Sequence, residues 1–70
     1  MSTLYGFARA DERDVDGDYP FSVWISQPDK RLPLIMVNGW RDTHDAAKSA
    51  MAACQTMLQE TFGQIDWGTT

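Results

Sequence analysis

The longest regular pattern in the chain is the spacing of hydrophobic residues between Thr43 and Phe62. Hydrophobic side chains recur there at steps of three and four residues, which places them on one side of an α-helix. The stretch contains no Gly or Pro and is rich in good helix formers. Asp42 or Thr43 can cap its N-terminus, and Gly63 is placed to end it. The pattern predicts a helix over residues 43–62. Its buried side is predicted to consist of Ala47, Ala50, Met51, Cys54, Met57, Leu58 and Phe62. Its polar side carries Lys48, Ser49, Gln55, Gln59 and Glu60.

Residues 3–10 and 21–27 alternate between two sides in the way that indicates half-buried β-strands. In the first stretch, Tyr5 and Phe7 point to one side, and small residues that would let a helix approach closely occupy the other. In the second stretch, Trp24 lies between two serines on one side. The opposite side carries three large hydrophobic residues, namely Phe21, Val23 and Ile25.

A third strand is predicted over residues 32–38, which are hydrophobic on both sides except at their ends. Pro33 cannot donate a backbone hydrogen bond, so it restricts the start of this strand to a sheet edge or a bulge. Asn38 and Gly39 are expected to end the strand before the helix begins.

The pattern leaves two features open. The first is which side of the third strand faces away from the helix. It is either the side of Leu34 and Met36 or the side of Ile35 and Val37. Residues 64–68 form either a short fourth strand or a tail packed on the helix, with Ile65 and Trp67 on one side.

The predicted order is therefore β-β-β-α, with or without a short terminal strand. Short connections favour a three-stranded antiparallel meander, and the single long helix packs on one face of that sheet. We expect an α+β fold in which residues 1–70 form a single small domain.

A single helix covers only one face of the sheet, so the other face is expected to be open. If the side of Phe21 faces the helix, Trp24 faces away from it, together with one side of the third strand. A contiguous hydrophobic patch on a small protein usually marks an interface. The aromatic candidates for partner binding are Tyr5, Phe7, Trp24 and Trp40.

Acidic residues outnumber basic ones by ten to six, which gives a formal net charge of −4. Nucleic-acid binders gain affinity mainly from Lys and Arg on phosphates, so this charge argues against that class. Five of the acids lie in residues 11–18, here called the acidic loop. We expect this loop to steer association with a basic protein partner. The acidic candidates for partner binding are Asp14, Asp16 and Asp18.

Residues 11–19 are predicted to form a hairpin loop, since Asp and Gly disfavour strands. Their spacing also suggests a calcium loop of the EF-hand type. With Asp14 and Asp16 at its third and fifth positions, Gly17 falls correctly at the sixth. The twelfth position, where a bidentate Glu belongs, is Val23, and a strand begins where a helix should follow. A solvated hairpin loop is the better interpretation, so no metal site is predicted.

Residue types that carry catalysis are few. His44, the only histidine, lies in the first turn of the predicted helix, where a surface position is its ordinary role. Cys54, the only cysteine, falls on the hydrophobic side, where a thiol packs as a small apolar group. The glycines are dispersed and form no phosphate-binding loop. The sequence predicts neither an enzyme nor a bound cofactor.

The composition is that of a folded chain, because 43% of the residues are hydrophobic. A single cysteine cannot form an internal disulfide, which fits a reducing compartment. The N-terminus lacks the basic start and apolar run of a signal peptide, and no stretch approaches the roughly 18 apolar residues of a membrane span. The expectation is a cytoplasmic protein that does not associate with membranes.

Two stretches carry a resemblance to a known family. The sequence DGDY at 16–19, followed by a strand, and a helix that opens with RDTHDAAKSAM resemble the N-terminal domain of HicB-type antitoxins. That family places an acidic turn before a strand and a Thr-led amphipathic helix after the sheet. The match touches about half of the chain and lacks the family's Pro/Leu/Pro/Gly run. It implies an antitoxin-like binder of a protein partner.

The leading hypothesis is a non-enzymatic protein-interaction module, a small acidic inhibitor or antitoxin-like binder of the phage or mobile-element type. It would bind a basic protein partner, or itself as a homodimer, through the open sheet face. The alternative is a binder of single-stranded nucleic acid that stacks bases on the same aromatics, with nearby cations on the phosphates. These cations are Arg9, Lys30, Arg31 and Arg41. A hydrolase built on His44 has the least support.

Overall fold

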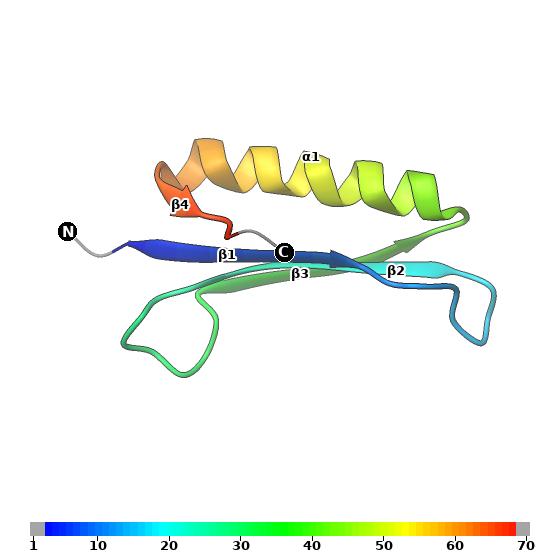
Figure 1. The fold of residues 1–70 in the computed structure, drawn as a ribbon, viewed down its shortest axis with the longest axis horizontal. Coiled ribbons are helices and arrows are strands. Elements are labelled where there is room, and N and C mark those ends of the chain that lie inside the picture. The colour runs from blue at the N-terminus through cyan, green and yellow to red at the C-terminus, as the bar shows by residue number, and fades with distance from the viewer. Residues whose placement is uncertain (1–2, 69–70) are drawn as a thin grey trace.

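The fold consists of a four-stranded sheet and one helix, in a computed structural model that describes residues 3–68. The elements in chain order are β1 (Leu4–Ala10), β2 (Tyr19–Ser26), β3 (Ile35–Arg41), α1 (His44–Phe62) and β4 (Ile65–Asp66). The strands lie side by side in the order β3-β2-β1-β4. β2 is antiparallel to both of its neighbours, whereas β4 is parallel to β1. α1 lies along one face of the sheet (Figure 1), so the predicted α+β meander with one covering helix is confirmed.

Both ends of α1 are fixed by local chemistry. The hydroxyl oxygen of Thr43 accepts a hydrogen bond from the backbone amide of Ala46 at 3.1 Å, as an N-cap does. At the other end, Gly63 adopts a left-handed φ of 82°, and its amide donates to the carbonyl oxygen of Gln59 at 3.0 Å. Of the two predicted caps, Thr43 is the one used, so the helix proper begins at His44.

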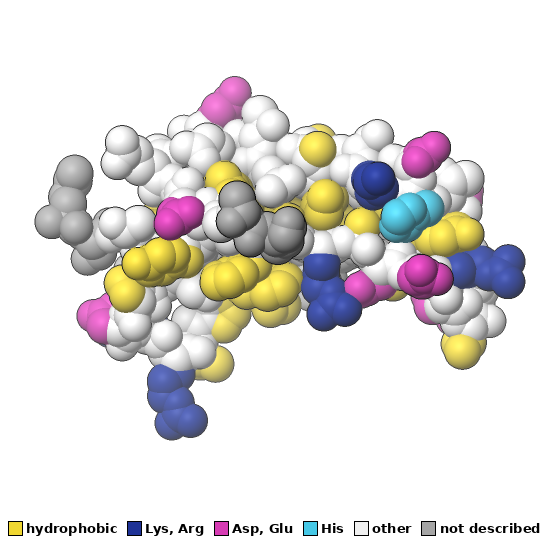
Figure 2. Space-filling model, in the orientation of Figure 1, with side chains coloured by type: hydrophobic (Ala, Val, Ile, Leu, Met, Phe, Trp, Pro, Cys, Tyr) yellow, Lys and Arg dark blue, Asp and Glu magenta, His cyan; other side chains and the backbone are white. Residues whose placement is uncertain are grey.

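The core lies between the central strand and the helix. The buried side chains from β2 are the predicted inward set Phe21, Val23 and Ile25, and those from α1 are Ala47 and Leu58. Partly buried residues complete the core, and they come from the other three strands, from the helix and from Trp67 after β4. In Figure 2, hydrophobic side chains gather in a band along the sheet below the helix, while the outer surface of the helix is mostly polar. Burial of the side chains between β2 and α1 is the main contribution to stability.

The prediction for the buried side of α1 is wrong at one position. Met57 is 52% exposed, whereas its neighbour Leu58 is 2% exposed. The residues that pack on the sheet follow one narrow series, which is Ala47, Met51, Cys54, Leu58 and Phe62. Met57 is about 100° around the helix axis from Leu58, which turns it toward the flank of the helix. A narrow sheet reaches only one stripe of the helix.

The bounds of β3 also differ from the prediction. The strand begins at Ile35 rather than at residue 32, so Pro33 lies in the connection before it. The strand does lie at a sheet edge, as Pro33 predicted. It then continues through Asn38 and Gly39 to Arg41, although these two residues were expected to end it. The reason is the ring of Phe21, the cross-strand partner of Gly39. A Cβ on Gly39 would lie 2.7 Å from that ring, so the aromatic ring covers the bare glycine backbone.

Residues 64–68 were expected to form either a short strand or a packed tail, and the structure shows one part of the segment as each. Ile65 and Asp66 form β4 beside the start of β1, and the following Trp67 packs against the core. A Cβ on Gly6 would lie 2.3 Å from the Trp67 ring, so the space above Gly6 is filled by this ring rather than by the helix. The indole Nε1 of Trp67 donates to Oε1 of Gln59 at 2.8 Å. Gln59 is exposed on the helix, as predicted. Through this hydrogen bond it also anchors the C-terminal segment.

Candidate functional site

The face of the sheet opposite the helix carries the candidate site. Within residues 3–68 no element covers this face, as Figure 1 shows. We call it the open face and define it by the outward side chains of the three long strands. These are Tyr5, Phe7 and Arg9 from β1, Ser22, Trp24 and Ser26 from β2, and Met36, Asn38 and Trp40 from β3.

An aromatic cluster occupies the centre of the open face. The register places Phe7 beside Trp24 and Trp24 beside Met36, so three large side chains form one row across the sheet. The Phe7 and Trp24 rings are stacked, with centroids 5.3 Å apart and an interplanar angle of 16°. Within the row, the exposed fraction is 44% for Phe7 and 50% for Met36. On either side of it, the exposed fraction is 39% for Tyr5 and 58% for Trp40. The row is a flat hydrophobic surface in contact with solvent.

The structure decides which side of β3 is open. Ile35 packs against the buried core, while Met36 is exposed on the opposite side. Of the two alternatives, the one with Met36 outward therefore holds. Leu34 is 45% exposed but lies in the connection just before the strand begins.

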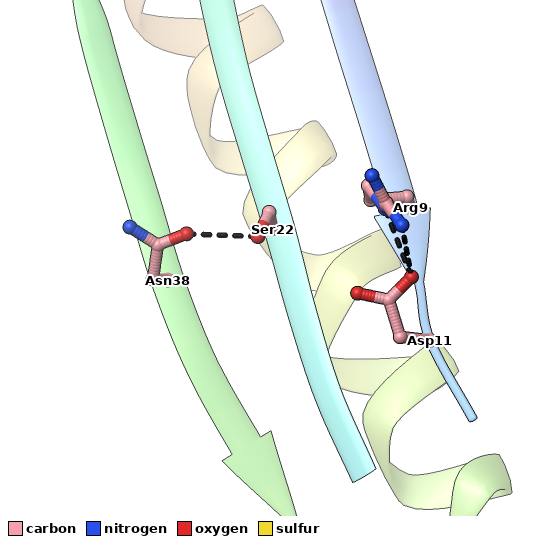
Figure 3. A network of polar contacts seen from close by, with 4 residues as sticks. All are labelled: Arg9, Asp11, Ser22 and Asn38. Carbon is pink, nitrogen blue, oxygen red and sulfur yellow. Dashed lines mark hydrogen bonds and ion pairs between the residues drawn. The ribbon is translucent and has the colours of Figure 1, made fainter. Parts of the chain in front are cut away.

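A polar row lies next to the aromatic cluster (Figure 3). The guanidinium of Arg9 forms an ion pair with Asp11 at 2.7 Å, and the hydroxyl of Ser22 donates to Oδ1 of Asn38 at 2.8 Å. The charge of Arg9 is therefore balanced on the open face itself. Arg41, another expected cation, lies instead on the helix side, over the ring of Phe21 at 5.6 Å from the ring centroid. These two cations do not extend the aromatic cluster into a basic surface.

The acidic loop is held in a defined shape by one of its own acids. Oδ1 of Asp14 accepts hydrogen bonds from the backbone amides of Asp16 and Asp18, each at 2.9 Å. Gly17 has a positive φ of 88°, and its amide donates to the Asp14 carbonyl oxygen at 3.1 Å. Asp14 thus organises the loop through its own side chain. Within residues 3–68, no group of three or more His, Cys, Asp or Glu is arranged to hold a metal ion.

The two hairpin connections lie at opposite ends of the open face. In Figure 1 the acidic loop and the β2–β3 connection, residues 27–34, both bend away from the helix at the two ends of the strands. The first carries five acids and one Arg, whereas the second carries Asp29 together with Lys30 and Arg31. The open face therefore has a strongly negative end and a weakly positive end.

The pKa of Asp18 is raised above its ordinary value of 3.8, first by loss of hydration and then by the charges of Asp14, Asp42 and Asp16. The folded protein therefore holds this proton more tightly than the unfolded chain does, so ionised Asp18 opposes folding. The opposition is fully present above the raised pKa and disappears as the pH falls below 3.8. We expect Asp18→Asn to be more stable than the wild type at neutral pH, with a difference that shrinks in acid. Urea unfolding over a pH series measures this, with Asp29→Asn as the control. A constant difference at every pH would contradict it.

The two residues with nucleophile or base chemistry lie apart. His44 is exposed at the start of α1, where its ring centroid is 5.7 Å from that of Tyr19. Cys54 is half-buried and packs against the core. Ten residues of helix separate them by about 15 Å along the axis. They do not form a joint site.

Of the predicted binding residues, the structure brings four onto one surface and leaves three at its end. Tyr5, Phe7, Trp24 and Trp40 share the open face, while Asp14, Asp16 and Asp18 lie in the acidic loop. Sequence reasoning missed Asn38 and left Met36 undecided. The signal was present in the alternation of residues 36–40, which becomes visible only if the strand runs through Gly39.

No helix in the described part of the chain is long and apolar enough to cross a membrane. The resemblance to the HicB-type N-terminal domain stays a prediction. Comparison with protein families, with curated proteins and with solved structures found no match to this chain.

Proposed function

We propose that this chain is a non-enzymatic protein-interaction module that binds a basic protein partner through its open face. In this proposal it acts as a small inhibitor or antitoxin-like protein, and the acidic loop steers the partner toward the face. The observation that carries the proposal is the exposed aromatic row across the sheet, centred on the stacked pair Phe7 and Trp24. A core side chain would be covered, and a purely solvated face would be polar.

The hydrophobic area of the open face is large enough to drive association. A fully buried aromatic side chain removes about 150–250 Å² from water, so the partly exposed residues of the row still offer a few hundred Å². At about 25 cal/mol per Å², this area favours association by several kcal/mol before the costs of binding. Trp and Tyr are also the residues most often found at the energetic centres of protein interfaces.

Charge supports a basic partner rather than a nucleic acid. The chain has a net charge of −4, and its acids concentrate at one end of the open face. Such a field attracts a basic protein and repels phosphates. Arg9 is already paired with Asp11, and Arg41 lies over Phe21 on the other side of the sheet. Two of the four cations that a base-stacking surface would use are therefore already engaged, and the other two, Lys30 and Arg31, lie at one end of the face.

Trp24→Ser tests the proposal, because it removes the centre of the aromatic row. A partner captured from a lysate of the source organism is purified, and its affinity is measured by calorimetric titration at several salt concentrations. We expect Trp24→Ser to weaken binding by about 30-fold or more, as loss of an interface hot spot does. We expect folding to be weakened by only about 1–3 kcal/mol, because the side chain is stacked but not enclosed.

The matched control is Met57→Ser, which also replaces an exposed hydrophobic residue but lies on the flank of α1. It should bind the partner as the wild type does. Affinity for a basic partner should also fall as salt rises, since steering by the acidic loop is screened. Equal affinity of wild type and Trp24→Ser would contradict the proposal. So would a captured ligand that is nucleic acid, which would favour the alternative function.

A further inference from the structure

One long edge of the sheet has no partner within residues 3–68. β3 lies at the end of the strand order, and its seven residues pair only with β2. The opposite edge differs, because β4 covers the start of β1 there. An unpaired edge strand exposes backbone donors and acceptors that readily pair with another strand.

The hydrogen-bond register identifies the backbone groups at this edge. The amide of Asp11 donates to the carbonyl oxygen of Pro20 at 2.8 Å, which extends the β1–β2 register by one hydrogen-bonded pair. Hydrogen-bonded residues alternate along antiparallel strands, so even-numbered residues of β2 bond to β1 and odd-numbered residues bond to β3. The carbonyl oxygen of Ile25 agrees, since it accepts the amide of Leu34 at 2.7 Å. Carried across to β3, the alternation turns three residues toward the edge, namely Met36, Asn38 and Trp40.

The edge carries none of the usual features that prevent pairing. β3 contains no Pro and no Lys, and its one charged residue is Arg41 at the last position. Both of its sides are also hydrophobic and incompletely covered. Ile35 and Val37 face the helix but are only half-buried, whereas Val23 and Ile25 of the neighbouring strand are fully buried. The hydrophobic core therefore extends to the edge strand, where its side chains remain partly exposed to solvent.

We infer that β3 pairs with β3 of a second copy of this chain, antiparallel, about a two-fold axis at Asn38. The outward backbone groups then form three hydrogen-bonded pairs, Met36 with the partner's Trp40, Asn38 with the partner's Asn38, and Trp40 with the partner's Met36. Each Trp lies beside a Met, which is a favourable sulfur–aromatic contact. No like charges face each other along the strand.

Asn38 is suited to the two-fold position. Its Oδ1 accepts the hydroxyl of Ser22 at 2.8 Å, and its amide nitrogen points away from Ser22 toward the outer side of β3 (Figure 3). Asn38 is uncharged, so its side chain and that of the partner's Asn38 meet at the axis without repulsion between like charges. The register itself is self-complementary, because it sets Met36 of each copy beside Trp40 of the other, and this favours a second copy over an unrelated extended peptide.

The area involved sets the expected strength of the dimer. The exposed parts of Trp40 and Met36 amount to about 250 Å² per copy, taking about 200–250 Å² for a fully exposed large side chain. With the backbone edge added, the interface remains near the lower end of specific ones, at or below about 1,200 Å² in total. The dimer should therefore be concentration-dependent rather than permanent. It uses Met36 and Trp40 at the edge of the open face but leaves the stacked pair Phe7 and Trp24 of each copy uncovered, so it goes beyond the proposed function.

Charge pairing at the two-fold axis is the sharpest test, with sedimentation of the full-length chain as the measurement. Asn38→Lys and Asn38→Asp each place like charges opposite one another, so each variant alone should dimerise about tenfold more weakly than the wild type or worse. An equimolar mixture of the two should recover a heterodimer. Asn38→Lys loses the bond from Ser22, whereas the carboxylate of Asn38→Asp can still accept it, and neither effect within a single chain explains recovery on mixing. Trp24→Ser should still dimerise, which separates this inference from the proposed function.

Cross-linking tests the register itself. Facing residues of a hydrogen-bonded pair have Cα atoms about 5.5 Å apart, which is within the range for a disulfide. Asn38→Cys in a Cys54→Ala background should form covalent dimers under mild oxidation. The control, Ser49→Cys in the same background, lies on the exposed side of α1 and should not. A wild-type chain that stays monomeric at all concentrations would overturn the inference. The inference would also be overturned if Asn38→Lys and Asn38→Asp dimerised as strongly as the wild type, or if Asn38→Cys cross-linked no faster than Ser49→Cys.

Discussion

Leu58→Ala is expected to lower the free energy of unfolding by about 2–5 kcal/mol, the range for truncation of a buried leucine. Leu58 is 2% exposed and packs against Val23 and Ile25, which are both fully buried. Removal of its side chain leaves a cavity at the contact between α1 and the central strand. A 70-residue domain has only a marginal total stability, so this loss is a large part of it.

Met57→Ala is the matched control for this prediction. It removes a side chain of similar size from the adjacent position, but that side chain is half exposed on the flank of the helix. Its cost should stay within about 0.5–1 kcal/mol, as for surface substitutions. Urea unfolding followed by circular dichroism measures both variants, and an unchanged slope against urea confirms two-state behaviour. Equal losses at the two positions would show that the helix contacts the sheet through a wider face.

Gly39→Ala is expected to destabilise the protein by about 1–3 kcal/mol, the cost of overpacking a tight site. In an ordinary strand this change would stabilise, because alanine loses less conformational freedom than glycine on folding. Here the new Cβ would lie 2.7 Å from the ring of Phe21, a buried core residue. The ring must move, and its packing against the helix is disturbed with it.

A double-mutant cycle with Phe21→Leu isolates this clash. Leucine lacks the ring atoms that meet the new Cβ, so the cost of Gly39→Ala should be smaller in the Phe21→Leu background than in the wild type. Thermal and urea unfolding of the four proteins provide the cycle. Additive effects, or a stabilised Gly39→Ala variant, would show that the ring does not cover the glycine.

The candidate site was predictable only in part. The alternation of β1 and β2 is a local, two-residue period, and it is enough to place Tyr5, Phe7 and Trp24 on the outward sides of their strands. Whether these residues touch depends on the register between strands, which pairs Phe7 with Trp24 and Trp24 with Met36. Register is decided by core packing across the whole sheet, so the sequence pattern of a single strand does not contain it.

The acidic loop shows the same limit in a different way. Its composition predicted a hairpin loop with a strong negative charge, and that much is a property of the residues themselves. The use of Asp14 as the acceptor for two backbone amides could not be read from the pattern of acids. That role arises because the loop closes between β1 and β2, whose pairing is set by the rest of the sheet. Asp14 thereby has a structural role in the loop.

The sequence alone determined the helix and the two regular strands, since capping by Thr43 and Gly63 and the repeats of hydrophobic residues act within a few residues of chain. The tertiary structure decided the rest of the sheet. β3 runs through Gly39 because a ring from the next strand covers it, and β4 forms because Trp67 finds space above Gly6. Both depend on contacts between residues far apart in the chain, whose packing energy overrides local strand propensity.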